Sequence, residues 1–469
     1  MLASAFAWAG CDRVFGLDEL PTPGTVTGTY AFRWPQNDTN GIPRIQERPA
    51  MPSEVSATVR RNGTVADVTF DGSGAFSFPV ADVDEPYAIT FHTDWRDYEY
   101  QLAAPRLTVV DRLAGRPDRT IAAPGTRVTL ALANRPDSTA VGIETVASTG
   151  IWSTFGIPSA AAIELDWTAA FGLLEMTQHD ALYYIGTQLV NPRGTLEYYQ
   201  TAYSAHLADV SLAQGTTTAL STTVSPVTPD LCVTVDVERQ RESERIAALV
   251  PNETNHSTTV WMYATAAPDF MMVSAVGLAV AVQYPPISDL ADETIAFANP
   301  IADATPYATF TVARQRNFDQ GAIATVTSIA VPIEDTRCGS SARLALRADV
   351  VAIPTGIALD GRELTADGPV TINPDHDALL SWQLTSTGDA ELFVVYIYEV
   401  SPTGLGFRRV IFTAERSARL DPSWLVPQHQ YLFVVQARLG LPAFANGDVS
   451  ATGPIWANAS AHTPIITAR

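Results

Sequence analysis

The sequence predicts a mainly β, multidomain chain of antiparallel β-sandwiches with few short helices. Short runs of alternating apolar and polar residues recur along the chain, as at residues 26–32 and 128–132, with Gly, Pro, Asn and Asp between them. This period of two is typical of strands with one buried face. Helical periodicity is scarce and is clearest over residues 238–249. A chain of 469 residues exceeds what one core usually fills, so we expect several domains.

The N-terminal segment, residues 1–22, carries a cysteine directly after a short apolar stretch. Ala9 and Gly10 precede Cys11, and small residues in this place are typical of secretory signals whose peptidase acts at a lipidated thiol. The segment resembles the start of a bacterial lipoprotein, and the run CDRVFGLDEL from Cys11 resembles the mature start of lipoproteins from myxobacteria. This resemblance implies lipidation of Cys11 and a linker up to residue 22. The alternative is a buried strand with a free cysteine.

Residues 23–106 form the first predicted domain. An opening strand contains VTGT from Val26, a hairpin is expected at residues 71–78 (DGSGAFSF), and a closing strand at residues 86–91 (PYAITF). Asp71 and the glycines beside it supply turn conformations, while Phe76 and Phe78 face one core. The region resembles a carboxypeptidase regulatory-like (transthyretin-like) β-sandwich. Such domains are mostly structural or adhesive spacers, which implies no catalytic residues here.

Residues 107–351 are β-rich and match no family pattern. This region contains Cys232 and Cys338, the two cysteines that remain beside Cys11. In an oxidising compartment an even pair favours a disulfide, which places the two Cα atoms within roughly 4.4 to 6.8 Å. The alternative is two separate buried thiols.

Five tyrosines of this middle region are candidate binding residues. They fall on an expected hairpin of residues 181–190 and 195–203. Exposed aromatic rings on a β-sandwich can stack on sugars or anchor protein partners. The alternative is that half of them face the core and the others are scattered on the surface. The candidates are Tyr183, Tyr184, Tyr198, Tyr199 and Tyr203.

Residues 352–469 form the last predicted domain. Leu380 and Trp382 are expected on its second strand, with the indole between two sheets. Leu425 and Tyr431 have the spacing of a turn-packing leucine and a tyrosine corner. The region is similar to a fibronectin type III module. Its third strand is expected to alternate through Phe393, Val395 and Ile397.

Charge and motifs limit the function. A net charge of −21 excludes nucleic acid as a partner, because phosphate binding needs a cationic surface. The longest apolar run, residues 271–282, is too short to span a bilayer, so contact with a membrane is expected through the lipid anchor only. The sequence has no HExxH, GxSxG, Walker A or GxGxxG motif. We therefore expect no enzyme activity, no catalytic residues, no cofactor and no metal site.

Three hypotheses remain open for what the protein does. The first is a lipid-anchored extracytoplasmic protein with a structural, adhesive or ligand-binding role, attached to the outer membrane and bound to a protein or glycan ligand. The second is a carbohydrate-active or other hydrolase with a carboxylate pair in the middle region. The third is a subunit of a cell-envelope assembly, in which the middle region docks onto its partners.

Overall fold

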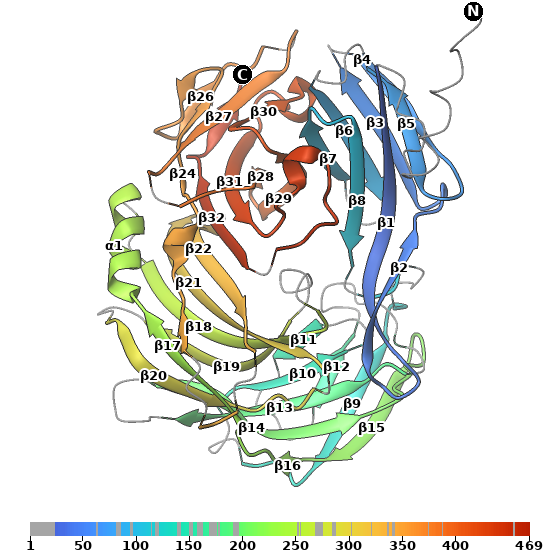
Figure 1. Ribbon diagram of the computed structural model, residues 1–469, viewed down its shortest axis with the longest axis vertical. Coiled ribbons are helices and arrows are strands. Elements are labelled where there is room, and N and C mark those ends of the chain that lie inside the picture. The colour runs from blue at the N-terminus through green and yellow to red at the C-terminus, as the bar shows by residue number, and fades with distance from the viewer. Residues whose placement is uncertain are drawn as a thin grey trace, which may run out of the picture.

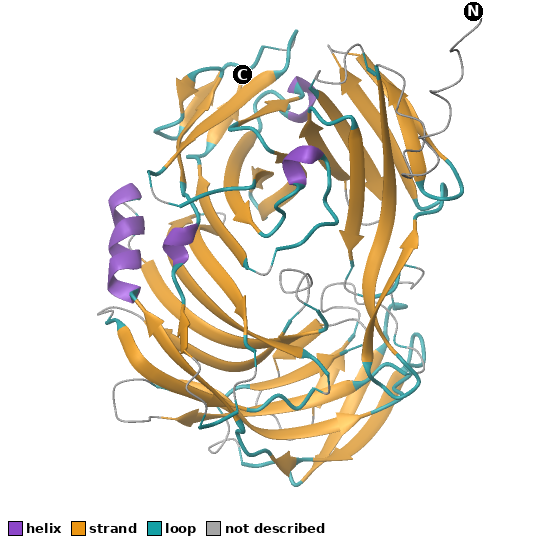
Figure 2. Ribbon diagram, viewed as in Figure 1, coloured by secondary structure: helices purple, strands orange, loops and turns teal. Residues whose placement is uncertain are grey.

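The fold is mainly β, as predicted: 62% of the residues lie in strands and 5% in helices (Figures 1 and 2). The computed structural model describes residues 24–61, 64–80, 86–93, 97–113, 115–117, 122–137, 142–149, 153–156, 163–167, 176, 179–190, 197–250, 253, 255–267, 275–283, 288–301, 303–319, 321–334, 337–339, 343–373, 375–386, 388–453 and 455–469. Within these ranges the strands form four two-layered units.

The first sandwich brings together eight strands. Asp71 turns the chain between two of them, because its carboxylate accepts hydrogen bonds from the main-chain N–H groups of Ser73 and Ala75. Phe76 and Phe78 are buried on one face, as predicted. The unit continues past the expected boundary at residue 106, since its last strand pairs in parallel with its first. The strands are β1 (Thr25–Asn37), β2 (Pro43–Pro49), β3 (Val55–Arg61), β4 (Thr64–Phe70), β5 (Ala75–Pro79), β6 (Tyr87–Thr93), β7 (Asp97–Leu102) and β8 (Arg106–Arg112).

The middle region forms two sandwiches. In the second sandwich, the sheet β12-β9-β15 packs over the sheet that contains β10, β11, β13, β14 and β16. Its strands are β9 (Arg127–Ala133), β10 (Glu144–Ser148), β11 (Ser153–Gly156), β12 (Ile163–Asp166), β13 (Leu182–Val190), β14 (Tyr198–Leu207), β15 (Thr217–Thr223) and β16 (Ser225–Pro226).

In the third sandwich, the sheet β20-β17-β23 packs over β19-β18-β21-β22. The helix expected at residues 238–249 is present as α1 (Arg239–Leu249), which buries Ile246 against this core. The strands are β17 (Leu231–Val237), β18 (Asn255–Thr265), β19 (Val276–Gln283), β20 (Leu290–Phe297), β21 (Thr305–Phe318), β22 (Gly321–Pro332) and β23 (Arg343–Ala345).

In the fourth sandwich, Trp382, Leu425 and Tyr431 are all buried. Trp382 lies on its second long strand and is buried with its ring 5.2 Å from that of Phe393. The Tyr431 hydroxyl accepts a hydrogen bond of 2.8 Å from the N–H of Val426, which is the geometry of a tyrosine corner. Leu425 is buried beside it. The strands are β24 (Pro354–Leu359), β25 (Arg362–Glu363), β26 (Gly368–Val370), β27 (Ala378–Leu384), β28 (Leu392–Ser401), β29 (Gly404–Thr413), β30 (Ser417–Leu420), β31 (Gln430–Leu439), β32 (Trp456–His462) and β33 (Ile466–Ala468), with 3-10 turns η3 (Ala348–Val350), η4 (Pro422–Trp424) and η5 (Phe444–Asn446).

The four sandwiches are joined edge to edge, which the sequence did not predict. One sheet of each contributes to a continuous path of paired strands, β4-β3-β6-β7-β29-β28-β31-β32-β22-β21-β18-β19-β14-β13-β10-β11. Three joints connect the units: β7 to β29, β32 to β22, and β19 to β14. Figure 1 shows the resulting arrangement, with the first sandwich on the right, the second at the bottom and the third on the left. The chain is therefore one connected scaffold.

Candidate functional site

The joint between the first and fourth sandwiches contains a pocket of 290 Å³. It lies where the parallel pairing of β7 with β29 ends, at Gln101 opposite Thr413. Beyond this point β29 gives way to β30, which belongs to the other sheet of the fourth sandwich. Here the Gln101 side chain makes the two hydrogen bonds that a neighbouring strand would make. Its amide N–H donates to the carbonyl of Arg419 at 2.6 Å, and its amide oxygen accepts from the N–H of Arg419 at 2.8 Å.

Arg60 is ion-paired with acidic side chains on both sides of this joint. Its guanidinium is paired with Glu99 of the same sandwich at 3.3 Å and with Asp377 of the fourth sandwich. It also lies over the ring of Trp424, 5.7 Å from the ring centroid. The Arg60 side chain is 10% exposed and that of Glu99 only 2%. Burial raises the pKa of Glu99, while Arg60 and the amide of Gln101 act in the opposite direction.

This geometry favours a clamp over acid–base chemistry. A hydrolytic pair needs two carboxyl groups that flank an open space of about 5 to 9.5 Å. Here Arg60 lies between Glu99 and Asp377 and is ion-paired with both. A second ion pair, Arg409 with Asp97, crosses the same joint. The arrangement can hold two modules in a fixed relation or take a ligand of mixed charge.

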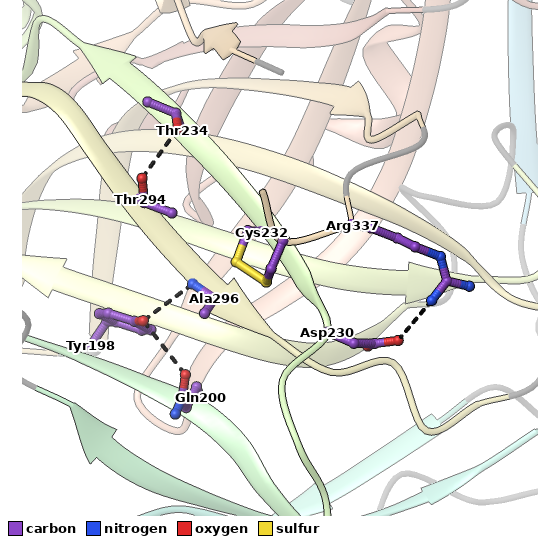
Figure 3. Close-up of a disulfide and its surroundings, with 9 residues drawn as sticks. Tyr198, Gln200, Asp230, Cys232, Thr234, Thr294, Ala296 and Arg337 are labelled. Atoms are coloured by element: carbon purple, nitrogen blue, oxygen red, sulfur yellow. Dashed lines mark hydrogen bonds and ion pairs between the residues drawn. A yellow bond between two sulfur atoms is a disulfide. The ribbon is translucent and has the colours of Figure 1, made fainter. Parts of the chain in front are cut away.

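The predicted disulfide is present (Figure 3). Cys232 and Cys338 have Cα atoms 4.6 Å apart, within the expected range, and are separated by 106 residues in the chain. The N–H of Cys338 donates to the carbonyl of Asp230 at 2.9 Å, and Asp230 is ion-paired with Arg337 at 3.6 Å. The bridge closes the third sandwich on itself.

The five candidate tyrosines form no exposed platform, which corrects the expectation for them. Their hairpin exists as β13 and β14, and much of it is covered on both faces, although Leu189 on β13 is 49% exposed. Tyr183 and Tyr198 point into the core of the third sandwich, whereas Tyr184 points into that of the second. Tyr199 and Tyr203 are half-buried.

Tyr184 takes part in a buried polar cluster of the second sandwich. Its hydroxyl donates to Glu144, which also receives a bidentate contact from Arg135. Burial acts to raise the pKa of Glu144, but the hydrogen bonds from Arg135 and Tyr184 outweigh it and lower that pKa. The cluster is fully paired and serves the packing of the sandwich.

Two polar pairs were invisible in the sequence because their members are far apart in it. Glu253 and His462 are buried in contact at 2.7 Å, and Arg60 reaches Asp377 across the first joint. No sequence signal marked Glu99 as buried, because it alternates with Tyr98 and Tyr100 as a solvent-facing side chain of a strand does.

Cys11 lies outside the described residues. Among the residues that the structure does describe, no helix is long and apolar enough to cross a membrane. The same part of the chain holds no group of three or more His, Cys, Asp or Glu side chains placed to bind a metal.

Comparisons with known proteins give no family. No family model matches the chain, and no curated protein matches it. Similar solved structures include a DUF4876 family protein from Bacteroides thetaiotaomicron, at 13% identity over 24% of this chain and a TM-score of 0.15; the match spans about a quarter (26%) of that protein. Another is a Ca²⁺-stabilised adhesin that helps an Antarctic bacterium bind ice, at 10% identity over 96% of this chain and 100% of that chain, with a TM-score of 0.17. At these TM-scores the similarity supports no inference about fold or function.

Proposed function

We propose that the protein is a non-enzymatic, lipid-anchored protein of the cell envelope that acts as a rigid extracytoplasmic scaffold and presents a surface to a ligand. The observation that carries the proposal is the disulfide between Cys232 and Cys338. Disulfides persist in oxidising compartments and are rare in the cytosol. A bridge that closes 106 residues adds about 4 to 5 kcal/mol to stability in the chain-entropy model, which suits a domain exposed outside the cytoplasm.

Rigidity follows from the joints between the sandwiches. Domains that are connected only by flexible linkers move independently of one another. In this chain, main-chain hydrogen bonds cross each joint, and Arg60 and Arg409 add ion pairs at the first one. A surface carried on such a scaffold keeps a fixed orientation relative to the other sandwiches.

The anchor itself is assigned to Cys11 from its sequence context. The test is fractionation of the native host after Cys11→Ala, which is expected to move the protein from membranes to the soluble fraction. The matched control is the double variant Cys232→Ser with Cys338→Ser, which removes two other cysteines and is expected to stay in the membrane fraction. Unchanged membrane association of Cys11→Ala contradicts the proposed anchor.

The hydrolase alternative has one observation in its favour, the raised pKa of Glu99 beside a pocket. Raised carboxyl pKa values are common in general acids. The test is hydrolysis of polysaccharide by the wild-type protein and by Glu99→Gln. Turnover by the wild type that the variant loses would favour the enzyme over the scaffold.

A further inference from the structure

On one stretch of the continuous sheet, the face opposite the core is partly open among the described residues. On β18, Val260 and Met262 are fully buried in the core of the third sandwich. Successive side chains of a strand point to opposite faces, so Thr259 and Trp261 point away from that core. Trp261 remains 37% exposed, which is unusual for the largest apolar side chain.

A row of polar side chains crosses five strands on this face; four of them are half-buried and Asn458 is buried. Thr259 is directly opposite Thr311, which is opposite Ser328 on the next strand. Ser328 is opposite Asn458, and Asn458 is opposite Arg438. Directly opposite residues share a face and are in reach of one another. This polar row runs over β18, β21, β22, β32 and β31, which lie side by side in Figure 1, and four strand spacings make it about 19 Å long.

An apolar row continues from the β18 end of the polar row. Trp261 is opposite Val280, Val280 is opposite Tyr199, and Tyr199 is opposite Leu189. Leu189 is 49% exposed. Val282, which is opposite Thr259 and so connects the two rows, is 43% exposed. Three of the chain's exposed large apolar side chains therefore gather on neighbouring strands of one face.

The polar row is held in place by its own hydrogen bonds. The hydroxyls of Thr311 and Ser328 are 2.9 Å apart. The amide of Gln436 donates to Asn458 at 3.3 Å and accepts from Arg438 at 2.5 Å. Hydroxyl and amide groups keep further donors and acceptors when they form one such bond. The row thus offers pre-oriented polar groups with one guanidinium and no carboxylate.

From this geometry we infer that the partly open face binds a neutral oligosaccharide, with a sugar ring over Trp261. Its hydroxyls lie at the half-buried members of the polar row, Thr259, Thr311 and Ser328. This rests on the proposed function as an exported ligand-binding scaffold. A sugar has an apolar C–H face and a hydroxyl-rich edge, which correspond to the apolar and the polar row. An acidic polymer is repelled by a protein of net charge −21.

The experiment is titration calorimetry with the full-length oxidised protein and a panel of neutral hexasaccharides: cellohexaose, xylohexaose, mannohexaose, maltohexaose and the N-acetylglucosamine hexamer. At least one is expected to bind. Trp261→Ala is expected to weaken that binding about tenfold, because it removes the stacking surface. Trp261→Phe keeps a ring and is expected to retain most of the affinity. Thr311→Val removes one hydroxyl at constant shape and is expected to weaken binding several-fold.

The matched control is Leu379→Ala on β27, which truncates a 43% exposed apolar side chain on a separate sheet and is expected to bind as the wild type does. Three binding results overturn the inference: no binding of any panel sugar at millimolar concentration, equal affinity of Trp261→Ala, or tighter binding of polygalacturonate than of the neutral sugars. A change confined to the oligomeric state of Trp261→Ala would identify the face as a protein interface and also overturns it. Since anchoring and the disulfide are measured independently, these results leave the proposed scaffold role standing.

Discussion

Removal of the Arg60 charge tests the clamp between the first and fourth sandwiches. In Arg60→Met the buried Glu99 loses its cationic partner while most of the aliphatic part of the side chain is kept. Glu99 keeps hydrogen bonds from Gln101 and Thr90, but these do not neutralise a charge. At pH 7 the unpaired carboxyl group of Glu99 can lose its charge by taking up a proton. For a carboxyl group with the ordinary pKa of 4.5, protonation at this pH costs about 3.4 kcal/mol. At pH 5 the same protonation costs only about 0.7 kcal/mol.

We therefore expect Arg60→Met to lower the free energy of opening at the joint by about 3 kcal/mol at pH 7 and by about 1 kcal/mol at pH 5. The assay is native-state hydrogen exchange at β7 and β29, since a chain with several cores has no single unfolding free energy. The double variant Arg60→Met with Glu99→Gln is expected to be more stable at pH 7 than the single variant. The exposed Arg44→Met serves as the control, with a loss of at most about 0.5 kcal/mol. A cost that is the same at both pH values would refute the reasoning.

Three further predictions concern stability. The pair of substitutions Cys232→Ser and Cys338→Ser is expected to cost the third sandwich about 4 to 5 kcal/mol in native-state hydrogen exchange at β17 and β20, and a loss below about 1 kcal/mol would show that the bridge restrains little. Trp382→Ala is expected to cost the fourth sandwich about 3 to 5 kcal/mol, because it empties a fully packed site; wild-type protection in hydrogen exchange would contradict the packing. The pKa of Glu99 is raised, so the folded protein keeps the Glu99 proton to a higher pH than the unfolded chain does. The contribution of this protonation to stability is therefore complete below pH 4.5 and is lost as the pH rises through the folded pKa. Glu99→Gln is expected to remove that part of the pH dependence, and an unchanged profile would contradict it.

The elements with local signals were predictable from the sequence. Alternation of apolar residues identified the strands, and the spacing of charges over residues 238–249 identified α1. Trp382 and Tyr431 indicated the fourth sandwich because their roles depend on positions within one module. The disulfide followed from the parity of the cysteines and the inferred compartment.

The joints and the burial of the tyrosines were not predictable in this way. Strand pairing between β7 and β29 depends on main-chain groups, which every residue except proline offers alike. Tyr183 and Tyr184 point to opposite faces of β13, and each face is covered by a different sandwich. The sequence of a single strand does not specify which other sheets pack on its two faces. The partly open face around Trp261 can be identified only once the register of its strands is known.

The most direct test of the extracytoplasmic, lipid-anchored scaffold is intact and peptide mass spectrometry of the protein isolated from envelopes of its native host without reductant. The account predicts that the mature chain begins at Cys11, that its N-terminal peptide carries a lipid mass, and that Cys232 and Cys338 are found in one cross-linked peptide pair. A chain that still carries the residues before Cys11, without a lipid and with both other thiols free, would contradict it.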